Sequence, residues 1–197
     1  MRSGKLRILA LAAAVCLLMS AFSPAAGVSA KTVKKNSDEY VKIKDDTDWI
    51  IFQTIYNLFY GSEEYITGKT TYKLTKEDYQ TVLLSYMIDG TEYYYTKAEI
   101  KALSKKLFGK SYVDSDFLSN FEKKGKKYFV NLGDYGQIDF KTDNLTISKK
   151  KGYIYVSGDY YADDYEGNLE DIGKLTFKFE QVGDDYALKG AKFTPAN

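Results

Sequence analysis

The sequence predicts an α+β fold, with N-terminal helices packed on a curved, cone-like antiparallel sheet of five or six strands. Apolar residues recur with a helical period as far as about Lys126 and then alternate with polar residues. Short turns separate the alternating runs, which indicates antiparallel strands because parallel crossovers need a dozen or more residues. A sheet with one apolar face that follows apolar helices is expected to pack under them.

Residues 1–30 are expected to be a signal peptide. A basic start (residues 1–7) precedes an apolar run from Ile8 to Phe22, and Val28-Ser29-Ala30 fits the small-x-small cleavage rule. The run is shorter than the roughly 20 residues of a membrane span. An uncleaved anchor and lipoprotein processing at Cys16 are the alternatives. We therefore expect a bacterial protein that is secreted or loosely associated with the cell wall, since exported eukaryotic domains of this size usually carry disulfides.

The mature chain is expected to be one domain, residues 47–197, behind a mobile charged lead-in, residues 31–46. The lead-in reads KTVKKNSDEYVKIKDD and is mostly charged and polar, which is typical of a segment without a packed core. The remaining chain has no Gly/Ser-rich linker and no internal repeat. A domain of this size can bury roughly 70% of its unfolded surface.

Three helices are predicted in the first half of the domain. The segment Trp49–Tyr60 is apolar on nearly every side, so we expect a buried helix that stops at Gly61. The second helix starts at Thr75, whose hydroxyl can cap it. The third starts at Thr96, the first residue of a capping box, and ends at Gly109.

Alternating apolar and polar residues predict strands in the second half. The apolar positions are Ile138, Phe140, Leu145, Ile147, Ile154, Val156, Leu175, Phe177 and Phe179. Turn residues separate the runs, and we expect turns at Gly133–Gly136, Thr142–Asn144, Lys151–Gly152 and Gly183–Asp185.

The composition excludes several classes of site. The 197-residue chain has no histidine, and its one cysteine, Cys16, lies in the expected signal peptide. A disulfide, a thiolate or imidazole metal site, and catalysis by histidine or cysteine are therefore excluded from the mature protein, and no cofactor is expected. The 28 basic and 27 acidic residues of the whole chain become 25 and 27 without residues 1–30. This near-neutral balance argues against a nucleic-acid partner, which needs a concentrated positive face.

Helices followed by antiparallel strands, from about Trp49 to Phe193, resemble the nuclear-transport-factor-two-like fold and the related cystatin-like arrangement. The run Lys174–Val182, a Gly-Asp-Asp turn and Tyr186–Lys189 look like the terminal hairpin of small secreted members. Thr96–Lys110 also resembles helices in secreted proteins of Gram-positive bacteria. The resemblance implies a cone-shaped sheet and assigns no catalytic residue, since such folds include both enzymes and binding modules.

Tyrosine is the strongest compositional anomaly, with 19 residues in the chain. The candidate ligand-binding residues lie in one expected strand and its exit loop: Tyr153, Tyr155, Tyr160, Tyr161 and Tyr165. If Ile154 and Val156 are in the core, Tyr153 and Tyr155 point outward, because side chains alternate along a strand. Outward rings with hydroxyl tips suit a sugar face or a protein partner. The alternative is that tyrosine serves here only as a strand former and half-buried filler.

Two further motifs have simpler alternatives. Acidic residues in the segment Asp159–Asp171 could form a calcium site outside the EF-hand class, and the alternative is a solvated loop. The calcium candidates are Asp159, Asp163, Asp164 and Glu166. Two segments contain the Gly-Lys-Ser/Thr end of a phosphate-binding loop, Phe108–Ser111 and Thr67–Thr70. Both lack the leading glycine of that motif, so we interpret them as a helix stop and a turn.

Two function classes remain open. The first is a monomeric binding module of the bacterial surface or secretome that holds a glycan, peptide or small ligand through tyrosines. The second is a histidine-free hydrolase or isomerase that uses Asp, Glu and Tyr in a cone-shaped pocket. A buried carboxylate facing a tyrosine in a concave pocket would favour the enzyme, whereas solvated acids and surface tyrosines would favour binding.

Overall fold

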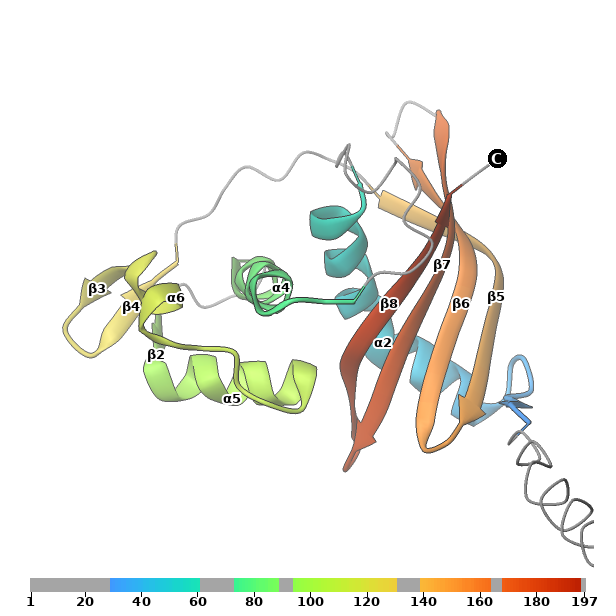
Figure 1. Ribbon diagram of the computed structural model, residues 1–197, viewed down its shortest axis with the longest axis horizontal. Coiled ribbons are helices and arrows are strands. Elements are labelled where there is room, and N and C mark those ends of the chain that lie inside the picture. The colour runs from blue at the N-terminus through green and yellow to red at the C-terminus, as the bar shows by residue number, and fades with distance from the viewer. Residues whose placement is uncertain (1–28, 61–72, 89–93, 131–138, 164–167, 196–197) are drawn as a thin grey trace, which may run out of the picture. The chain divides into compact units, whose positions relative to one another are not determined.

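The computed structural model describes residues 29–60, 73–88, 94–130, 139–163 and 168–195 (Figure 1). Most of the expected signal peptide, with Cys16, lies outside the described residues, as do Gly61 and the motif at Thr67–Thr70. The elements in chain order are β1 (Lys31–Thr32), α2 (Asp38–Leu58), α4 (Lys76–Ile88), β2 (Tyr94–Thr96), α5 (Lys97–Phe108), α6 (Ser115–Ser119), β3 (Glu122–Lys124), β4 (Lys127–Phe129), β5 (Asp139–Lys150), β6 (Tyr153–Asp163), β7 (Leu169–Val182) and β8 (Asp185–Pro195).

The fold class is α+β, with N-terminal helices followed by a five-stranded antiparallel sheet, as the sequence predicts. The sheet has the order β1-β5-β6-β7-β8, and every neighbouring pair is antiparallel. Its apolar face and the apolar face of α2 share one buried core, and α2 runs along the sheet in Figure 1. Core residues of the sheet are Ile147, Ile154, Val156, Leu175, Phe177, Phe179, Leu188 and Phe193. The cone-like curvature of this sheet stays a prediction.

The prediction of a mobile lead-in over residues 31–46 is wrong for most of these residues. Lys31–Thr32 form β1, and α2 begins at Asp38, eleven residues before the predicted start at Trp49. The Ser37 side chain caps the helix by accepting from the Tyr40 backbone N–H at 3.2 Å, and the acidic first turn suits the positive end of the helix dipole. Tyr40 and Ile43 are buried at helical spacing, whereas charged residues of the same turns, such as Glu39 and Lys42, are exposed on the solvent face.

The helix predicted to be buried over Trp49–Tyr60 buries its aromatic side chains only in part. Phe59 lies in the core, whereas Trp49 is 39% exposed and Phe52 is half-buried. The Trp49 and Phe52 rings stack with their centroids 5.1 Å apart, and the Phe52 ring also contacts Phe140 of β5 at 5.2 Å. The isoleucines and Leu58 form the main buried face of α2 instead.

The other two predicted helices are confirmed. Thr75 and Asp78 cap α4 reciprocally through each other's backbone N–H groups. Thr96 begins α5 with a complete capping box, and Gly109 ends α5 in the left-handed region at φ 76°. The Lys189 ammonium of β8 donates to the Phe108 carbonyl at 3.0 Å, which places a positive charge at the negative end of α5.

A second, three-stranded sheet of order β2-β4-β3 and the five-residue helix α6 were not expected from the sequence. Each strand of this small sheet has only three residues, too few to show an alternating pattern. The β3–β4 hairpin turns at Gly125-Lys126, with Gly125 at φ 65°.

The turn expected at Thr142–Asn144 is wrong, because β5 continues through it. The pairing of β5 with β6 shifts between Asp143 and Thr146, which is a β-bulge, and Asn144 takes φ 51°. Asparagine tolerates this left-handed backbone better than most residues. Turn-like residues here therefore distort a strand without ending it.

Candidate functional site

Strand β6 has the alternation predicted for it. Ile154 and Val156 are 3% and 1% exposed in the core, and Tyr153 and Tyr155 are half-buried on the opposite, outer face of the sheet. The Lys178 ammonium of β7 lies 3.6 Å from the centroid of the Tyr153 ring. One face of this ring is therefore already covered by a cation.

The five candidate tyrosines do not form one surface. Tyr160 is 3% exposed, and its ring contacts the Phe177 ring edge-on at 5.9 Å, so its assignment to an outer ligand surface is wrong. The reason is the strand period of two, which puts Tyr160 on the side of Ile154 and Val156. Tyr161 is half-buried on the outer face, and Tyr165 lies outside the described residues.

The acidic segment gives no calcium site in the described part of the chain. Asp159 accepts a hydrogen bond from the Asn144 side chain at 2.8 Å, and Asp163 is ion-paired with Lys141. The two carboxylates are four residues apart on regular β6, about 13 Å by strand geometry, too far to share one ion. Asp164 and Glu166 lie outside the described residues.

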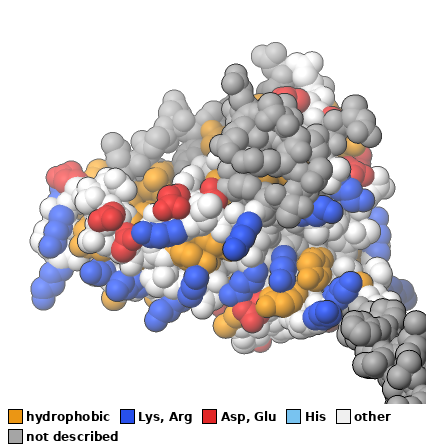
Figure 2. Space-filling view, viewed as in Figure 1, with side chains coloured by type: hydrophobic (Ala, Val, Ile, Leu, Met, Phe, Trp, Pro, Cys, Tyr) orange, Lys and Arg blue, Asp and Glu red, His pale blue; other side chains and the backbone are white. Residues whose placement is uncertain are grey.

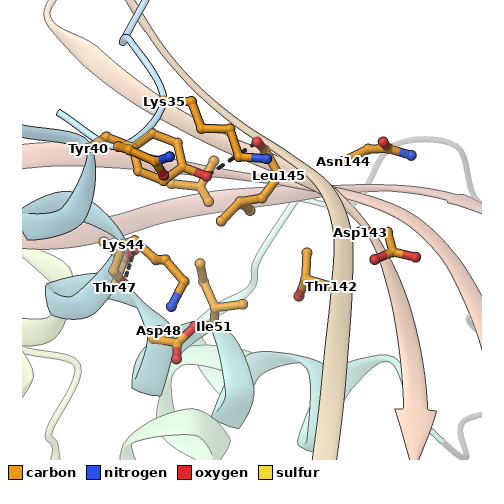
Figure 3. Close-up of a pocket in the computed structure, with 12 residues that line it drawn as sticks. Lys35, Tyr40, Lys44, Thr47, Asp48, Ile51, Thr142, Asp143, Asn144 and Leu145 are labelled. Carbon is orange, nitrogen blue, oxygen red and sulfur yellow. Dashed lines mark hydrogen bonds between the residues drawn. The ribbon is translucent and has the colours of Figure 1, made fainter.

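A pocket of about 350 Å³ opens between the first half of α2 and the bulged part of β5 (Figure 3). We call it the α2–β5 pocket. It is lined by Lys35, Asn36, Tyr40, Lys44, Thr47, Asp48, Ile51, Thr142, Asp143, Asn144, Leu145 and Val156. None of these residues is among the five candidate tyrosines.

Three contacts hold the two walls of this pocket together. The Val33 backbone N–H donates to the Ile147 carbonyl at 2.8 Å, continuing the pairing of β1 with β5. Glu39 in the first turn of α2 is ion-paired with Lys149. The Tyr40 hydroxyl donates to the Leu145 carbonyl at 3.3 Å, beside the bulge. The pocket walls are therefore fixed by contacts at the start of α2.

Charged groups of both signs face the pocket. Lys44, Asp48 and Ile51 lie on successive turns of α2, and Figure 3 shows Lys44 and Asp48 on the helix wall opposite Thr142. Lys35 reaches in from the segment before α2, close to the Tyr40–Leu145 hydrogen bond. Asp48 is exposed to solvent. The pocket therefore has two ammonium groups at its wall, from the exposed Lys35 and from Lys44, which lies 4.0 Å from the Asp45 carboxylate. Of its hydroxyls, those of Tyr40 and Thr47 already donate to backbone carbonyls, and the third belongs to Thr142.

Asp143 and Asn144 belong to the rim of the pocket. In Figure 3 their side chains point away from the helix, on the far side of the β5 ribbon. Both residues are exposed. The Asn144 amide is held by Asp159, so the bulge fixes its direction.

Tyr160 lies next to this pocket on its buried side. It is paired directly with Thr142 in the β5–β6 ladder, and its phenol interacts with the Thr142 side chain. Burial raises the pKa of Tyr160 well above its ordinary value, and the negative charge of Asp48 raises it further. The phenol is therefore protonated at neutral pH and can donate a hydrogen bond.

Comparison of the chain with family models, with curated proteins and with solved structures found no match. Within the described ranges, no helix is long and apolar enough to cross a bilayer. Over the same residues, no group of three or more Asp, Glu, Cys or His side chains could hold a metal ion.

Sequence reasoning missed the α2–β5 pocket because seven of its twelve lining residues lay in the expected lead-in and the turn expected at Thr142–Asn144. The available signal was the helical spacing of Tyr40, Ile43, Thr47 and Ile50/Ile51, which extends the apolar face of α2 back through the charged residues. Ser37 followed by two acids is also a helix-start pattern.

Proposed function

We propose that this protein is an exported binding module whose α2–β5 pocket holds a small polar ligand with an acidic group. The observation that carries the proposal is the presence of two ammonium groups, Lys35 and Lys44, and the Thr142 hydroxyl around one cavity. Its volume of about 350 Å³ is in the range of small-molecule sites. A sugar acid or a peptide carboxylate has the matching chemistry, because a carboxylate accepts from ammonium and hydroxyl groups.

The acids of the pocket support binding over catalysis. A hydrolase or isomerase without histidine needs a carboxyl group whose pKa is raised by burial beside its partner. Asp48 and Asp143 are both exposed, and the one buried carboxylate among the described residues, Asp163, is paired with Lys141. A histidine-free hydrolase or isomerase remains the alternative, with Asp48 as the acid, Tyr40 as the phenol that lines the pocket and Tyr160 as the buried phenol beside Thr142.

The outer-face tyrosines Tyr153, Tyr155 and Tyr161 are a second candidate site for the same function. A sugar or peptide could contact their rings on the sheet surface. The ammonium of Lys178 covers Tyr153, however, and would have to be displaced before a sugar could stack on that face. At the α2–β5 pocket the Lys44 ammonium is paired with Asp45 only at 4.0 Å, and Lys35 makes no ion pair among the described residues, so we place the ligand there.

Export and release, with residues 1–30 as a cleaved signal peptide, are part of the proposal, as is a monomeric state. The charge pattern of residues 1–30 supports export. Mass spectrometry of the protein purified from the medium should give the mass of a chain that starts at Lys31. A chain retained in the cell with Met1 intact would contradict the proposal.

Calorimetric titration of the mature protein tests the ligand class. We would compare glucuronate with glucose, and a dipeptide with its C-terminal amide. At least one acidic member should bind, and more tightly than its neutral counterpart, because only the acid can pair with the lysines. Lys44→Gln should weaken this binding about tenfold, an effect of the size expected for one charged hydrogen bond.

The matched control is Lys34→Gln, which removes the same charge from an exposed residue that does not line the pocket. This variant should bind as the wild type does. Equal loss in both variants would mean that only net charge matters, and loss confined to a Tyr153→Ser/Tyr155→Ser protein would place the ligand on the outer sheet face.

A further inference from the structure

Charge is unevenly distributed in the molecule, and one region is strongly basic. Residues 94–130 contain nine lysines and four acids, a net charge of +5, whereas the whole chain has a net charge of +1. Figure 2 shows basic side chains over α5 and the β3–β4 hairpin, and others farther along the same face over the five-stranded sheet. The near-neutral total therefore hides a local positive face of the kind that polyanions require.

The lysines of this face come from two elements. Lys97, Lys101 and Lys105 follow one another at four-residue intervals on α5, about 6 Å apart along the helix axis. The β3–β4 hairpin adds more, and β4 is joined to the start of α5 through the pairing of Lys127 with Thr96 of β2. We call these residues the basic surface: Lys97, Lys101, Lys105, Lys123, Lys126 and Lys127.

Most charges of the basic surface are not neutralised by the protein. Within the described ranges, Lys97, Lys101, Lys105, Lys123 and Lys126 make no ion pair, whereas Glu122 is paired with Lys124. Glu99 lies close enough to Lys127 for that lysine to lower its pKa, but its main partner is the Thr96 cap. Several ammonium groups are thus available to an external anion.

A concave site lies between the two elements. A pocket of about 320 Å³ is lined by Lys97, Ser115, Ser119, Lys123 and Tyr128 together with two apolar side chains, and no acid lines it. Asp116 lies beside the two lining serines: its carboxylate accepts from the Ser115 hydroxyl at 3.3 Å and its carbonyl accepts from Ser119. Two ammonium groups and a tyrosine hydroxyl can therefore surround one phosphate-sized anion.

We propose that the basic surface binds a linear polyanion through its phosphate groups, with one phosphate seated between Lys97 and Lys123. Evenly spaced lysines along α5 fit successive charges on one chain, whereas a flat bilayer would not reach into the concave site. The one exposed large apolar side chain of this region in the described residues, Tyr94, has the Lys124 ammonium 5.7 Å from its ring, which does not favour membrane insertion. This site shares no lining residue with the α2–β5 pocket, so either proposal can fail alone.

The test is binding of fluorescently labelled inorganic polyphosphate to the mature protein, measured by anisotropy over a range of salt concentrations. Wild-type protein should bind, with affinity falling steeply as salt rises. Lys97→Gln/Lys123→Gln should bind at least tenfold more weakly at low salt, and its log–log salt slope should fall by about 2, because two phosphate contacts are lost. Both lysines are exposed, so the variant should melt as the wild type does.

Lys150→Gln/Lys192→Gln is the matched control, since it removes two exposed lysines from the five-stranded sheet. It should keep the wild-type affinity and slope. Three results overturn the proposal: no binding by wild type, equal loss in both double variants, or tighter binding to anionic vesicles or to an oligonucleotide of equal charge. Tighter binding to vesicles would assign the surface to a membrane, and tighter binding to the oligonucleotide would assign it to a nucleic acid.

Discussion

At the scale of single residues, strand β6 divides its tyrosines between the two faces of the sheet. Tyr153 and Tyr155 share the outer face with polar neighbours, whereas Tyr160 packs on Phe177 and contacts Thr142 beside the α2–β5 pocket. A residue type that is common in the whole chain thus has two separate roles here. Outer rings cover the sheet, and the buried ring belongs to the core.

This division predicts unequal costs of truncation. Tyr153→Ser/Tyr155→Ser should lower the free energy of unfolding by about 1–2 kcal/mol, since both rings are only half-buried. Tyr160→Ser alone should lower it by about 3–5 kcal/mol, as expected for a core aromatic. Urea denaturation measures both, and a double variant that costs more than the single one would contradict the face assignment.

Tyr160 also predicts how stability depends on pH. Its pKa is raised above the ordinary value of 10.0 in the folded protein, so folding favours the protonated phenol. The contribution is complete below about pH 10 and is lost as pH rises beyond it, because the unfolded state then releases the proton first. The free energy of unfolding, measured from pH 8 to 11, should therefore decline above pH 10, and the decline should be shallower in Tyr160→Phe. Identical declines in the wild type and the variant would contradict a raised pKa for Tyr160.

At the scale of elements, the end of α5 depends on two residues far apart in the sequence. Gly109 has φ 76°, and a Cβ at that position would overlap the Lys189 ammonium, which donates to the Phe108 carbonyl. Gly152 has φ 78° with open space where its Cβ would lie. The two glycines thus have the same backbone requirement and different surroundings.

Gly152→Ala should therefore cost about 1 kcal/mol for the left-handed backbone alone. Gly109→Ala should cost about 1 kcal/mol more, because it also displaces the lysine from the end of α5. Thermal melting compares them, with Lys189→Met/Gly109→Ala expected to be less destabilising than the sum of its parts. Equal costs for both alanine variants would show that Lys189 does not matter to α5.

At the scale of the whole molecule, residues 31–46 connect the helical part to the sheet. Val33, Tyr40 and Ile43 are all buried, and this segment supplies β1, the cap of α2 and part of the α2–β5 pocket. A chain that begins at residue 47 should therefore lose more than about 5 kcal/mol relative to one that begins at residue 31, since each large buried side chain contributes about 2–5 kcal/mol. Calorimetry checks this, and equal cooperative melting of both chains would mean that the segment is a dispensable lead-in.

Sequence patterns among neighbouring residues predicted much of the secondary structure. They failed where contacts between residues far apart in the sequence determine the structure. The capping boxes, the Gly109 stop and the alternation around Ile154 are confirmed, because neighbouring residues determine each of them. The start of α2 and the α2–β5 pocket depend on contacts such as Tyr40 with Leu145, 105 residues apart. The start of α2 was missed because charged residues on its solvent face obscure the helical pattern of the apolar residues. The bulge in β5 was missed because its residues are typical of a turn.

The central claim is that α2 and β5 enclose the ligand site, and a backbone ¹H–¹⁵N NMR titration tests it most directly. The acid that binds best in calorimetry would be added to labelled mature protein, and amide shifts would be mapped along the chain. We predict the largest shifts at Lys44, Asp48, Thr142 and Leu145, reduced at equal ligand concentration in Lys44→Gln. Shifts confined to Tyr153, Tyr155 and Lys178, with none along the first half of α2, would contradict the account.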